Sequence, residues 1–237
     1  MRQLFQPFTI VERVLRERVA YFGEIARGEG LRQKIADLTI ITVAGLAVFG
    51  FVAGLSGHSF FQALLTSVKL PGVFLATGII CLPTLYYFSI LFGSRLRFMQ
   101  TVALILTAQA IAAVLAMGTA PISLLFLISG SELPFLVALN IGMLALSAAL
   151  GLIFLIQGVL YVQESNPPDR LTFFTWAGMF VKGTLRSIVL TVWSIVYGLV
   201  GTQLSYTLRP FFGIPVAGND FWSSMNSILT SLLSMGR

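Results

Sequence analysis

The chain has 237 residues, of which 57% are hydrophobic and only 10% are Asp, Glu, Lys or Arg. A soluble domain carries about 25% charged residues, so this composition excludes a soluble fold of this size. The net charge of +6 does not indicate a nucleic-acid surface, because seven of the 15 basic residues precede the first apolar stretch, where anionic lipid is the expected partner. Cys81 is the only cysteine, which excludes an intramolecular disulfide and a cysteine-rich metal site.

Residues 1–37 form a polar segment that contains a predicted amphipathic helix. Arg13, Arg16, Glu17 and Glu24 lie opposite its apolar face on a helical wheel. The apolar face consists of Val11, Val14, Leu15, Val19, Phe22, Ile25 and Ala26. Two interpretations stay open: the helix docks on a membrane surface or a partner, or it packs under the protein's own bundle.

Five stretches are apolar and long enough to cross a bilayer, which takes about 20 residues in a helix. They are Leu38–Ser56, Leu70–Gly93, Phe98–Gly118, Leu133–Val162 and Ile188–Leu208. The sequence therefore predicts an all-α, polytopic transmembrane helical bundle of about five spans, with amphipathic helices at both termini. The corresponding domains are residues 1–37, 38–208 and 209–237.

Proline and glycine divide the apolar part of the chain further. Pro83 lies inside the second stretch, where it removes a backbone donor and is expected to kink the helix. Helix breakers at residues 130–134 interrupt the apolar run that starts at Pro121, which leaves Ile122–Ile128 as a re-entrant or interfacial piece. The eleven residues 171–181 are too few to span and are expected to lie in the headgroup layer, unless they insert and move the C-terminus to the other side.

The basic residues predict the orientation, because cytoplasmic loops carry an excess of Lys and Arg. With the N-terminus in the cytoplasm, the inside segments 1–37, 94–97 and 163–187 hold twelve basic residues. The outside segments 57–69, 119–132 and 209–237 then hold three, which are Lys69, Arg209 and Arg237. We therefore expect a multi-pass membrane protein with its N-terminus in the cytoplasm and its C-terminus outside.

The predicted spans contain no ionisable side chain away from their ends, which disfavours a proton-coupled transporter. Gln109, Asn140 and Gln157 are the long polar side chains inside them, and such groups usually hydrogen-bond between helices. Gly50 and Gly54 have the four-residue spacing that permits close helix contact. We therefore assign these five residues to helix–helix packing, while a role of Pro83 and the three amides in lining a solute path stays open.

The tail after the last span carries the candidate binding residues. Arg209 could clamp a lipid phosphate or a partner carboxylate, or simply reach the headgroups, and Phe211 and Phe212 follow it at the interface. Farther on, Phe221, Trp222 and Met225 begin an apolar stripe at helical spacing whose polar side has no charge. Because lipid-seeking helices usually carry cations, a protein partner is slightly favoured over lipid for this stripe.

The chain also contains two longer sequence motifs, KLPGVFLATGIICLPTLYYFSILFGSRLR at residues 69–97 and VGTQLSYTLRPFFG at residues 200–213. With them it resembles an uncharacterised group of bacterial five-span membrane proteins, over most of residues 28–213. The order of five spans after a cytoplasmic N-terminus is also similar to the Yip superfamily, whose eukaryotic members bind Rab GTPases and shape vesicle membranes. The resemblance implies a five-span bundle in a bacterial cytoplasmic (inner) membrane or a related internal membrane. It implies no established activity, and the tail from Ile214 departs from the pattern of the group.

No phosphate-binding loop, nucleophile elbow, metal-binding helix pair or paired carboxylates occur in the sequence, and His58 is the only histidine. We therefore expect no catalytic residues, no metal and no cofactor. The predicted function is a non-enzymatic integral membrane subunit or scaffold, with the lipid bilayer and other integral membrane proteins or further copies of itself as partners. The alternative is a small transporter or channel component for a neutral or lipidic solute.

Overall fold

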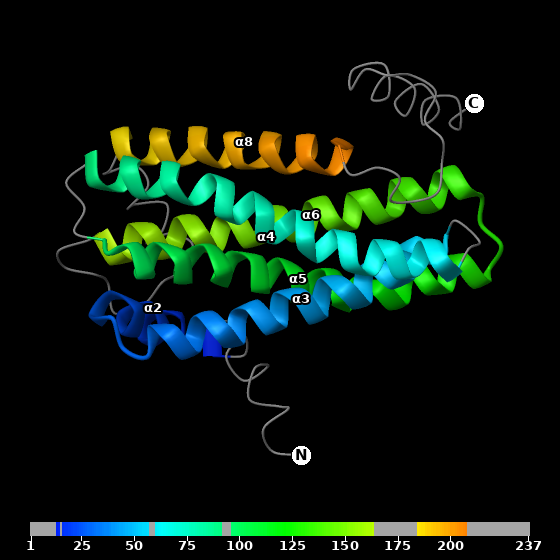
Figure 1. Cartoon of the computed structure of the whole chain (residues 1–237), viewed down its shortest axis with the longest axis horizontal. Coiled ribbons are helices and arrows are strands. Elements are labelled where there is room, and N and C mark those ends of the chain that lie inside the picture. The colour runs from blue at the N-terminus through cyan, green and yellow to red at the C-terminus, as the bar shows by residue number, and fades with distance from the viewer. Residues whose placement is uncertain (1–12, 15, 57–59, 92–95, 164–183, 208–237) are drawn as a thin grey trace, which may run out of the picture.

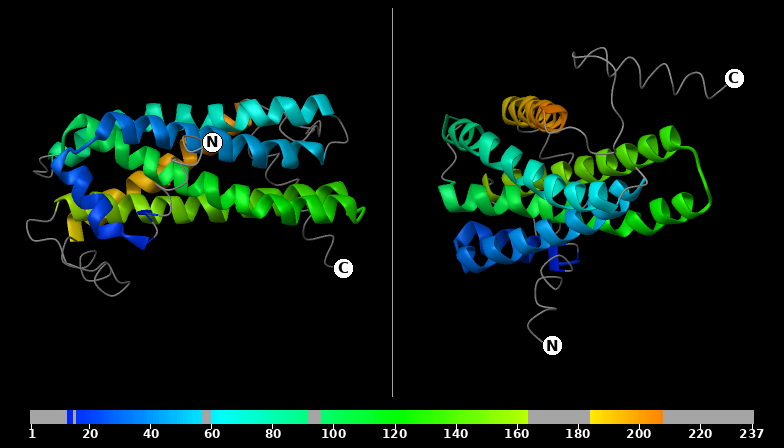
Figure 2. Two further views of the ribbon diagram at one scale, coloured as in Figure 1. Left: turned by 90° about the horizontal axis from the view of Figure 1, so that it is seen from below. Right: turned by 45° about the vertical axis from the view of Figure 1, so that its right-hand side comes forward.

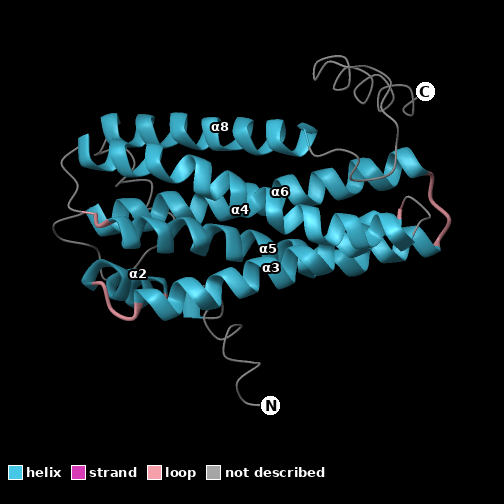
Figure 3. Cartoon of the chain, in the orientation of Figure 1, coloured by secondary structure: helices cyan, strands magenta, loops and turns pink. Residues whose placement is uncertain are grey.

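A computed structural model describes residues 13–14, 16–56, 60–91, 96–163 and 184–207. All regular secondary structure in these residues is helical (Figure 3). The helices are α2 (Arg18–Arg27), α3 (Leu31–Leu55), α4 (Phe60–Leu91), α5 (Phe98–Ile128), α6 (Leu133–Gln163) and α8 (Thr184–Thr207). The predicted all-α fold class is thus confirmed for the described part of the chain.

The long helices lie side by side along the long axis of the molecule (Figure 1). Helix α5 packs against α3, α4 and α6, and α3 also packs against α4. Helix α8 lies along α4, whereas the short α2 packs on α5 and α6 at one end of the bundle. Figures 1 and 2 place α2 and α8 on opposite sides of the bundle. The two helices therefore pack independently against the bundle of α3, α4, α5 and α6.

Four helices, α3, α4, α5 and α6, are long and apolar enough to cross a membrane. Large apolar side chains are exposed along their outer surfaces, for example Val68 at 71%, Leu125 at 65% and Leu146 at 62%. A water-soluble protein rarely exposes so much apolar surface, and lipid chains are the natural cover for it. The structure is therefore that of a multi-pass membrane protein.

The start of α4 corrects the prediction that residues 57–69 form a loop. Helix α4 begins at Phe60, ten residues before the predicted second span, and it contains Lys69. Tertiary packing explains the difference: Ala63 and Thr66 are buried against the glycines of α3, so this stretch is helical although it is less apolar than the rest. Lys69 consequently lies inside a candidate span, and the prediction that the spans lack internal ionisable residues is wrong.

The end of α5 corrects a second prediction. Ile122–Ile128 is not a separate re-entrant or interfacial piece but the last two turns of α5, which continues through Pro121. A proline can remain inside such a helix because neighbouring groups satisfy the freed backbone, and the flanking Ala120 and Ser123 are buried. The predicted break after it is confirmed, since α5 ends at Ile128, Gly130 has a φ of 77° and α6 begins at Leu133.

Other boundaries differ less. Helix α3 begins at Leu31, before the predicted first span, and Pro83 lies within the continuous helix α4, as does Pro71. Helix α8 covers most of the predicted fifth span, Ile188–Leu208. Residues 171–181, His58 and the whole tail 209–237 lie outside the described residues.

Candidate functional site

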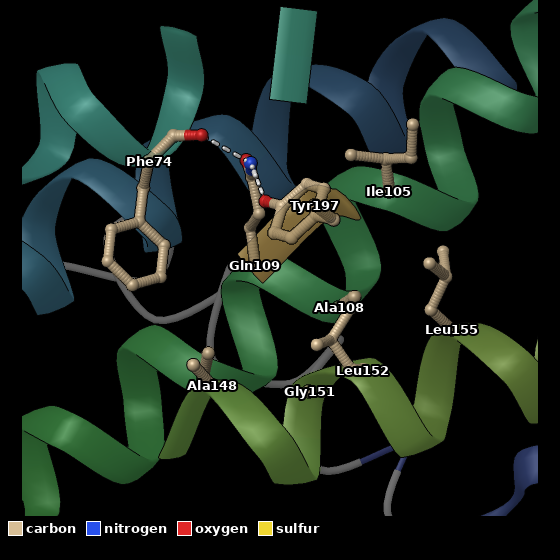
Figure 4. Close-up of a pocket in the computed structure, with 10 residues that line it drawn as sticks. Phe74, Ile105, Ala108, Gln109, Ala148, Gly151, Leu152, Leu155 and Tyr197 are labelled. Atoms are coloured by element: carbon tan, nitrogen blue, oxygen red, sulfur yellow. Dashed lines mark hydrogen bonds between the residues drawn. The ribbon is translucent and has the colours of Figure 1, made fainter. Parts of the chain in front are cut away.

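A polar junction in the middle of the bundle joins three helices (Figure 4). Its centre is Gln109 of α5, which is 3% exposed. The amide nitrogen Nε2 of Gln109 donates to the backbone oxygen of Phe74 in α4 at 2.5 Å and to the hydroxyl oxygen of Tyr197 in α8 at 2.9 Å. One side chain therefore ties α5 to both α4 and α8.

Two glycines make room for this junction. A Cβ atom added to Gly78 of α4 would lie 2.5 Å from Nε2 of Gln109, so the amide reaches the α4 backbone only because Gly78 has no side chain. On the other side of α5, a Cβ on Gly151 of α6 would lie 2.5 Å from the backbone oxygen of Ala108. Both distances are far below van der Waals contact. The second shows that α5 packs backbone to backbone against α6, whereas at Gly78 it is the Gln109 side chain that approaches the backbone of α4.

A small pocket adjoins the junction (Figure 4). It lies among α4, α5, α6 and α8, and its volume is about 20 Å³, which is close to the room that one water molecule needs. Its lining residues are Phe74, Ile105, Ala108, Gln109, Ala112, Ala148, Gly151, Leu152, Leu155 and Tyr197. Of the three amides predicted either to pack helices or to line a path, only Gln109 borders this pocket.

The other two amides lie elsewhere in the bundle. Asn140 of α6 accepts a hydrogen bond from the hydroxyl of Ser123 in α5 at 2.8 Å, and its Nδ2 donates to the backbone oxygen of Leu136 at 2.8 Å. Gln157 is 8% exposed, and its Oε1 has no hydrogen-bond partner in the described structure. The structure thus places Gln109 and Asn140 between helices and does not bring the three amides together.

Gly50 and Gly54 lie where α3 approaches α4. A Cβ on Gly50 would lie 2.8 Å from the backbone oxygen of Thr66, and one on Gly54 would lie 2.6 Å from Cα of Ala63. The four-residue spacing therefore serves contact within the chain, and this part of α3 is covered by α4. The face of α3 that carries the two glycines is therefore not available to another chain.

A second polar junction holds α2 on the end of the bundle. Gln100, in the first turn of α5, donates from Nε2 to the backbone oxygens of Ile25 at 2.9 Å and Ala26 at 2.8 Å. These are among the last carbonyls of α2, and the Ile25 oxygen also accepts from the capping Gly28 N–H at 3.0 Å. The hydroxyl of Thr107 donates to Ala103 at 2.7 Å, so its oxygen accepts from the Tyr21 hydroxyl at 2.9 Å.

Charged residues surround this second junction. Glu24 of α2 accepts from Lys34 at 2.7 Å and from Arg13 at 2.6 Å, and hydrogen bonding by Lys34 is the main reason that the pKa of its carboxyl lies below its usual value. Burial raises the pKa of the Tyr21 hydroxyl to about 12. The Arg18 guanidinium lies 4.5 Å from the centre of the Phe154 ring in α6. Together with buried Tyr21, Phe22 and Ile25, these contacts fasten α2 to its own bundle.

The sequence-based candidates for binding fall outside the described residues: Arg209, Phe211, Phe212, Phe221, Trp222 and Met225. The structure adds Tyr197, Gly78, Tyr21 and Gln100 as residues of the two junctions. None was singled out from sequence, because each pairs with a residue far away in the chain. Among the residues that the structure describes, no three His, Cys, Asp or Glu side chains lie together as a metal site would need.

Comparisons with protein-family models, with curated proteins and with solved structures find no match to this chain. The similarity to the bacterial five-span group and to the Yip superfamily therefore stays a prediction.

Proposed function

We propose that this protein is a non-enzymatic integral membrane subunit or scaffold that helps assemble or anchor a larger membrane protein complex. The observation that carries the proposal is how the buried polar groups are used. Gln109, Gln100, Asn140 and Tyr21 bond to other helices of the same chain, and the pocket beside Gln109 has room for about one water molecule. Buried polar groups used in this way stabilise a bundle, and the pocket beside Gln109 is too small for a larger substrate.

The topology belongs to the same proposal: α3, α4, α5 and α6 cross the membrane, and α8 is a fifth crossing. At 1.5 Å per residue the 24 residues of α8 extend about 36 Å, which exceeds the hydrocarbon thickness of about 30 Å. Moving Lys69 from the outer loops into α4 leaves Arg209 and Arg237 as the outer basic residues, against twelve inside. This stronger bias favours the N-terminus in the cytoplasm of a bacterial inner or related internal membrane and the C-terminus outside.

The two predicted amphipathic ends have different roles in this proposal. The apolar face of α2 is occupied, since Tyr21, Phe22 and Ile25 are buried against α5 and α6. That supports the interpretation in which the N-terminal helix packs under its own bundle. The tail, with Phe221, Trp222 and Met225 on its apolar stripe, is then the segment that meets another membrane protein or a second copy.

The test is mass spectrometry of the proteins that co-purify with a tagged chain from its native membrane in a mild detergent. A copy that ends after Gly213 is purified beside it, because this truncation removes the apolar stripe and leaves every described helix intact. We expect a stoichiometric partner, or a homo-oligomer, that disappears with the truncation. Recovery of the full-length chain as a monomer without partners would contradict the scaffold role.

A further inference from the structure

Exposed apolar side chains begin at different heights on two sides of the bundle. At the end where α2 lies, α2 and α3 are on one side, called the α2 side, and α4 and α8 are on the opposite side, called the α8 side (Figures 1 and 2). Farther along the bundle α3 and α4 converge, and they touch at Gly50 and Gly54. Heights on the two sides can therefore be compared along the bundle axis, with positions toward the α2 end called below.

Gln109 provides a reference level for the α8 side. A Cβ on Gly78 of α4 would lie 2.5 Å from the Gln109 amide, and Tyr197 of α8 is bonded to the same amide, so the three residues lie at about one height. Tyr87 is nine residues past Gly78 in α4, or about 14 Å below the reference level at 1.5 Å per residue. Helix α8 starts at the α2 end (Figure 1), and its one charged residue, Arg186, lies 11 residues before Tyr197, or about 17 Å below.

The α8 side is uncharged between these heights. Helix α4 has no charged residue after Lys69, and α8 has none after Arg186. Large apolar side chains are exposed here on both helices: Ile79, Ile80, Tyr87 and Phe88 of α4 and Val192, Ile195 and Val196 of α8. Such a surface needs lipid contact, so the hydrocarbon layer extends to about 17 Å below the reference level on this side.

The apolar surface of the α2 side starts higher. Helix α4 returns between α3 and α5, so α3 and α5 run in the same direction. Gly45 of α3 touches the backbone of Ala113, which is four residues beyond Gln109, so Ile41 lies at the reference level. Asp37, the last charged residue of α3, is then only about 6 Å below that level. Because charges avoid the hydrocarbon layer, its boundary on this side lies close to Asp37.

The charges of α2 lie below the same boundary. The last turn of α2 is bonded to Gln100, which is nine residues before Gln109, or about 14 Å below it. Glu24 of α2 holds its two ion pairs here, and Arg32 at the start of α3 is exposed. The α2 side is therefore charged at the height where Tyr87 is 65% exposed on the α8 side.

We propose that the lipid-facing belt runs obliquely around the bundle, so that the bundle stands tilted in the bilayer with α2 in the headgroup layer. The hydrocarbon boundary lies about 11 Å lower on the α8 side than on the α2 side. At the α2 end α5 separates α3 from α4, so two helix spacings of about 9 Å and one helix diameter of about 10 Å put the outer surfaces about 28 Å apart. These lengths give a tilt of about 20°, which is the average for membrane-crossing helices.

The far end of the bundle has the matching offset. Where α4 packs on α3, Phe61 is 68% exposed and lies about 26 Å above the reference level. Helix α8 ends at Thr207, only about 15 Å above it. A hydrocarbon layer of about 30 Å thus fits the α2 side from Asp37 to Phe61 and the α8 side from Arg186 to Thr207. The tilt depends on the membrane crossing of α3 to α6 and not on the scaffold role.

Spin labels at matched heights test the tilt. The full chain carries Cys81→Ala, which removes its only cysteine, and is purified and reconstituted in vesicles of phosphatidylcholine and phosphatidylglycerol. Gln33→Cys of α3 and Tyr87→Cys of α4 place one label each at exposed positions about 12 and 14 Å below the reference level. Ile40→Cys and Ile79→Cys, at positions 56% and 71% exposed, form a second pair close to that level. Electron paramagnetic resonance measures the depth of each label from its accessibility to oxygen and to a water-soluble nickel chelate.

We expect the α4 label of each pair to lie about 10 Å deeper in the hydrocarbon than its α3 partner. Tyr87→Cys should then be accessible to oxygen and Gln33→Cys to the nickel chelate, whereas an upright bundle would place Tyr87 slightly farther out than Gln33. Equal depths within the pairs, or a deeper label on α3, would overturn the proposal. A difference in only one pair would also overturn it, because a tilt displaces both pairs alike and a local distortion of the bilayer does not.

Discussion

Two glycines of α6 offer a matched test of the close packing between α5 and α6. Gly151→Ala adds a methyl group that would lie 2.5 Å from the backbone oxygen of Ala108 and 3.1 Å from Cβ of Ala112. Gly142→Ala adds the same group at a position where nothing lies within 4 Å. The two variants share the helix and the chemical change, and they differ in the contact alone.

The expected magnitudes follow from two opposing effects. Alanine in place of glycine inside a helix contributes about 0.5–1 kcal/mol of stability, and this is the full effect expected for Gly142→Ala. Overpacking costs about 1–3 kcal/mol, and a clash with backbone is the unfavourable case because no side chain can rotate away. Gly151→Ala should therefore lower the free energy of unfolding by up to about 2 kcal/mol, so that the two variants differ by about 1–3 kcal/mol.

The assay is reversible unfolding in mixed micelles by titration with a denaturing detergent, followed by tryptophan fluorescence. Trp193 is buried in the bundle and is a useful reporter. Equal shifts of the two variants in the same direction would refute the inferred backbone contact between α5 and α6.

Three further predictions concern the polar junctions. In a double-mutant cycle of Gln109→Leu with Tyr197→Phe, unfolding free energies should reveal a coupling of about 0.6–1.7 kcal/mol, and strict additivity would contradict the hydrogen bond. Gln100→Leu removes the side-chain donor to the Ile25 and Ala26 oxygens and leaves Ile25 with the bond from the Gly28 N–H, so hydrogen exchange in α2 should accelerate while exchange in α6 stays unchanged. The folded-state pKa of Glu24 is lowered, so its stabilising effect is present above the unfolded value of ~4.3 and is lost as the pH falls through the folded value. The protection of the α2 amides, taken relative to the intrinsic exchange rate at each pH, should therefore fall on acidification, and fall less in Glu24→Gln.

Length and apolarity were sufficient to locate most helices. The stretches that predicted the third and fourth spans lie within α5 and α6, and the first lies within α3 except for its last residue, Ser56. An uncharged apolar run of this length has few alternatives to a membrane-crossing helix. The errors at Phe60 and Pro121 have a common cause. Hydropathy contains no information on the glycines of a neighbouring helix, against which Ala63 and Thr66 are buried. It also contains none on the packing that keeps a proline inside α5.

The sequence predicted some residues of the polar junctions but not their partners. Gln109 and Asn140 stand out because long polar side chains are rare in apolar stretches, so a packing role could be expected for them. The partner of Gln109 in α4 is a backbone oxygen and its partner in α8 is 88 residues away, and no sequence pattern marks either. The same cause explains the prediction for Lys69. Because the second span was predicted to begin at Leu70 and α4 begins at Phe60, Lys69 was assigned to a loop.

The side of the membrane on which the tail lies tests the account most directly, because the scaffold role needs a five-span bundle that presents residues 209–237 outside. The measurement is a pair of fusions at Arg237, one to alkaline phosphatase, which is active only outside the cytoplasm, and one to green fluorescent protein, which fluoresces only inside. The account predicts phosphatase activity and no fluorescence. Fluorescence without phosphatase activity would place the tail in the cytoplasm and contradict an odd number of crossings.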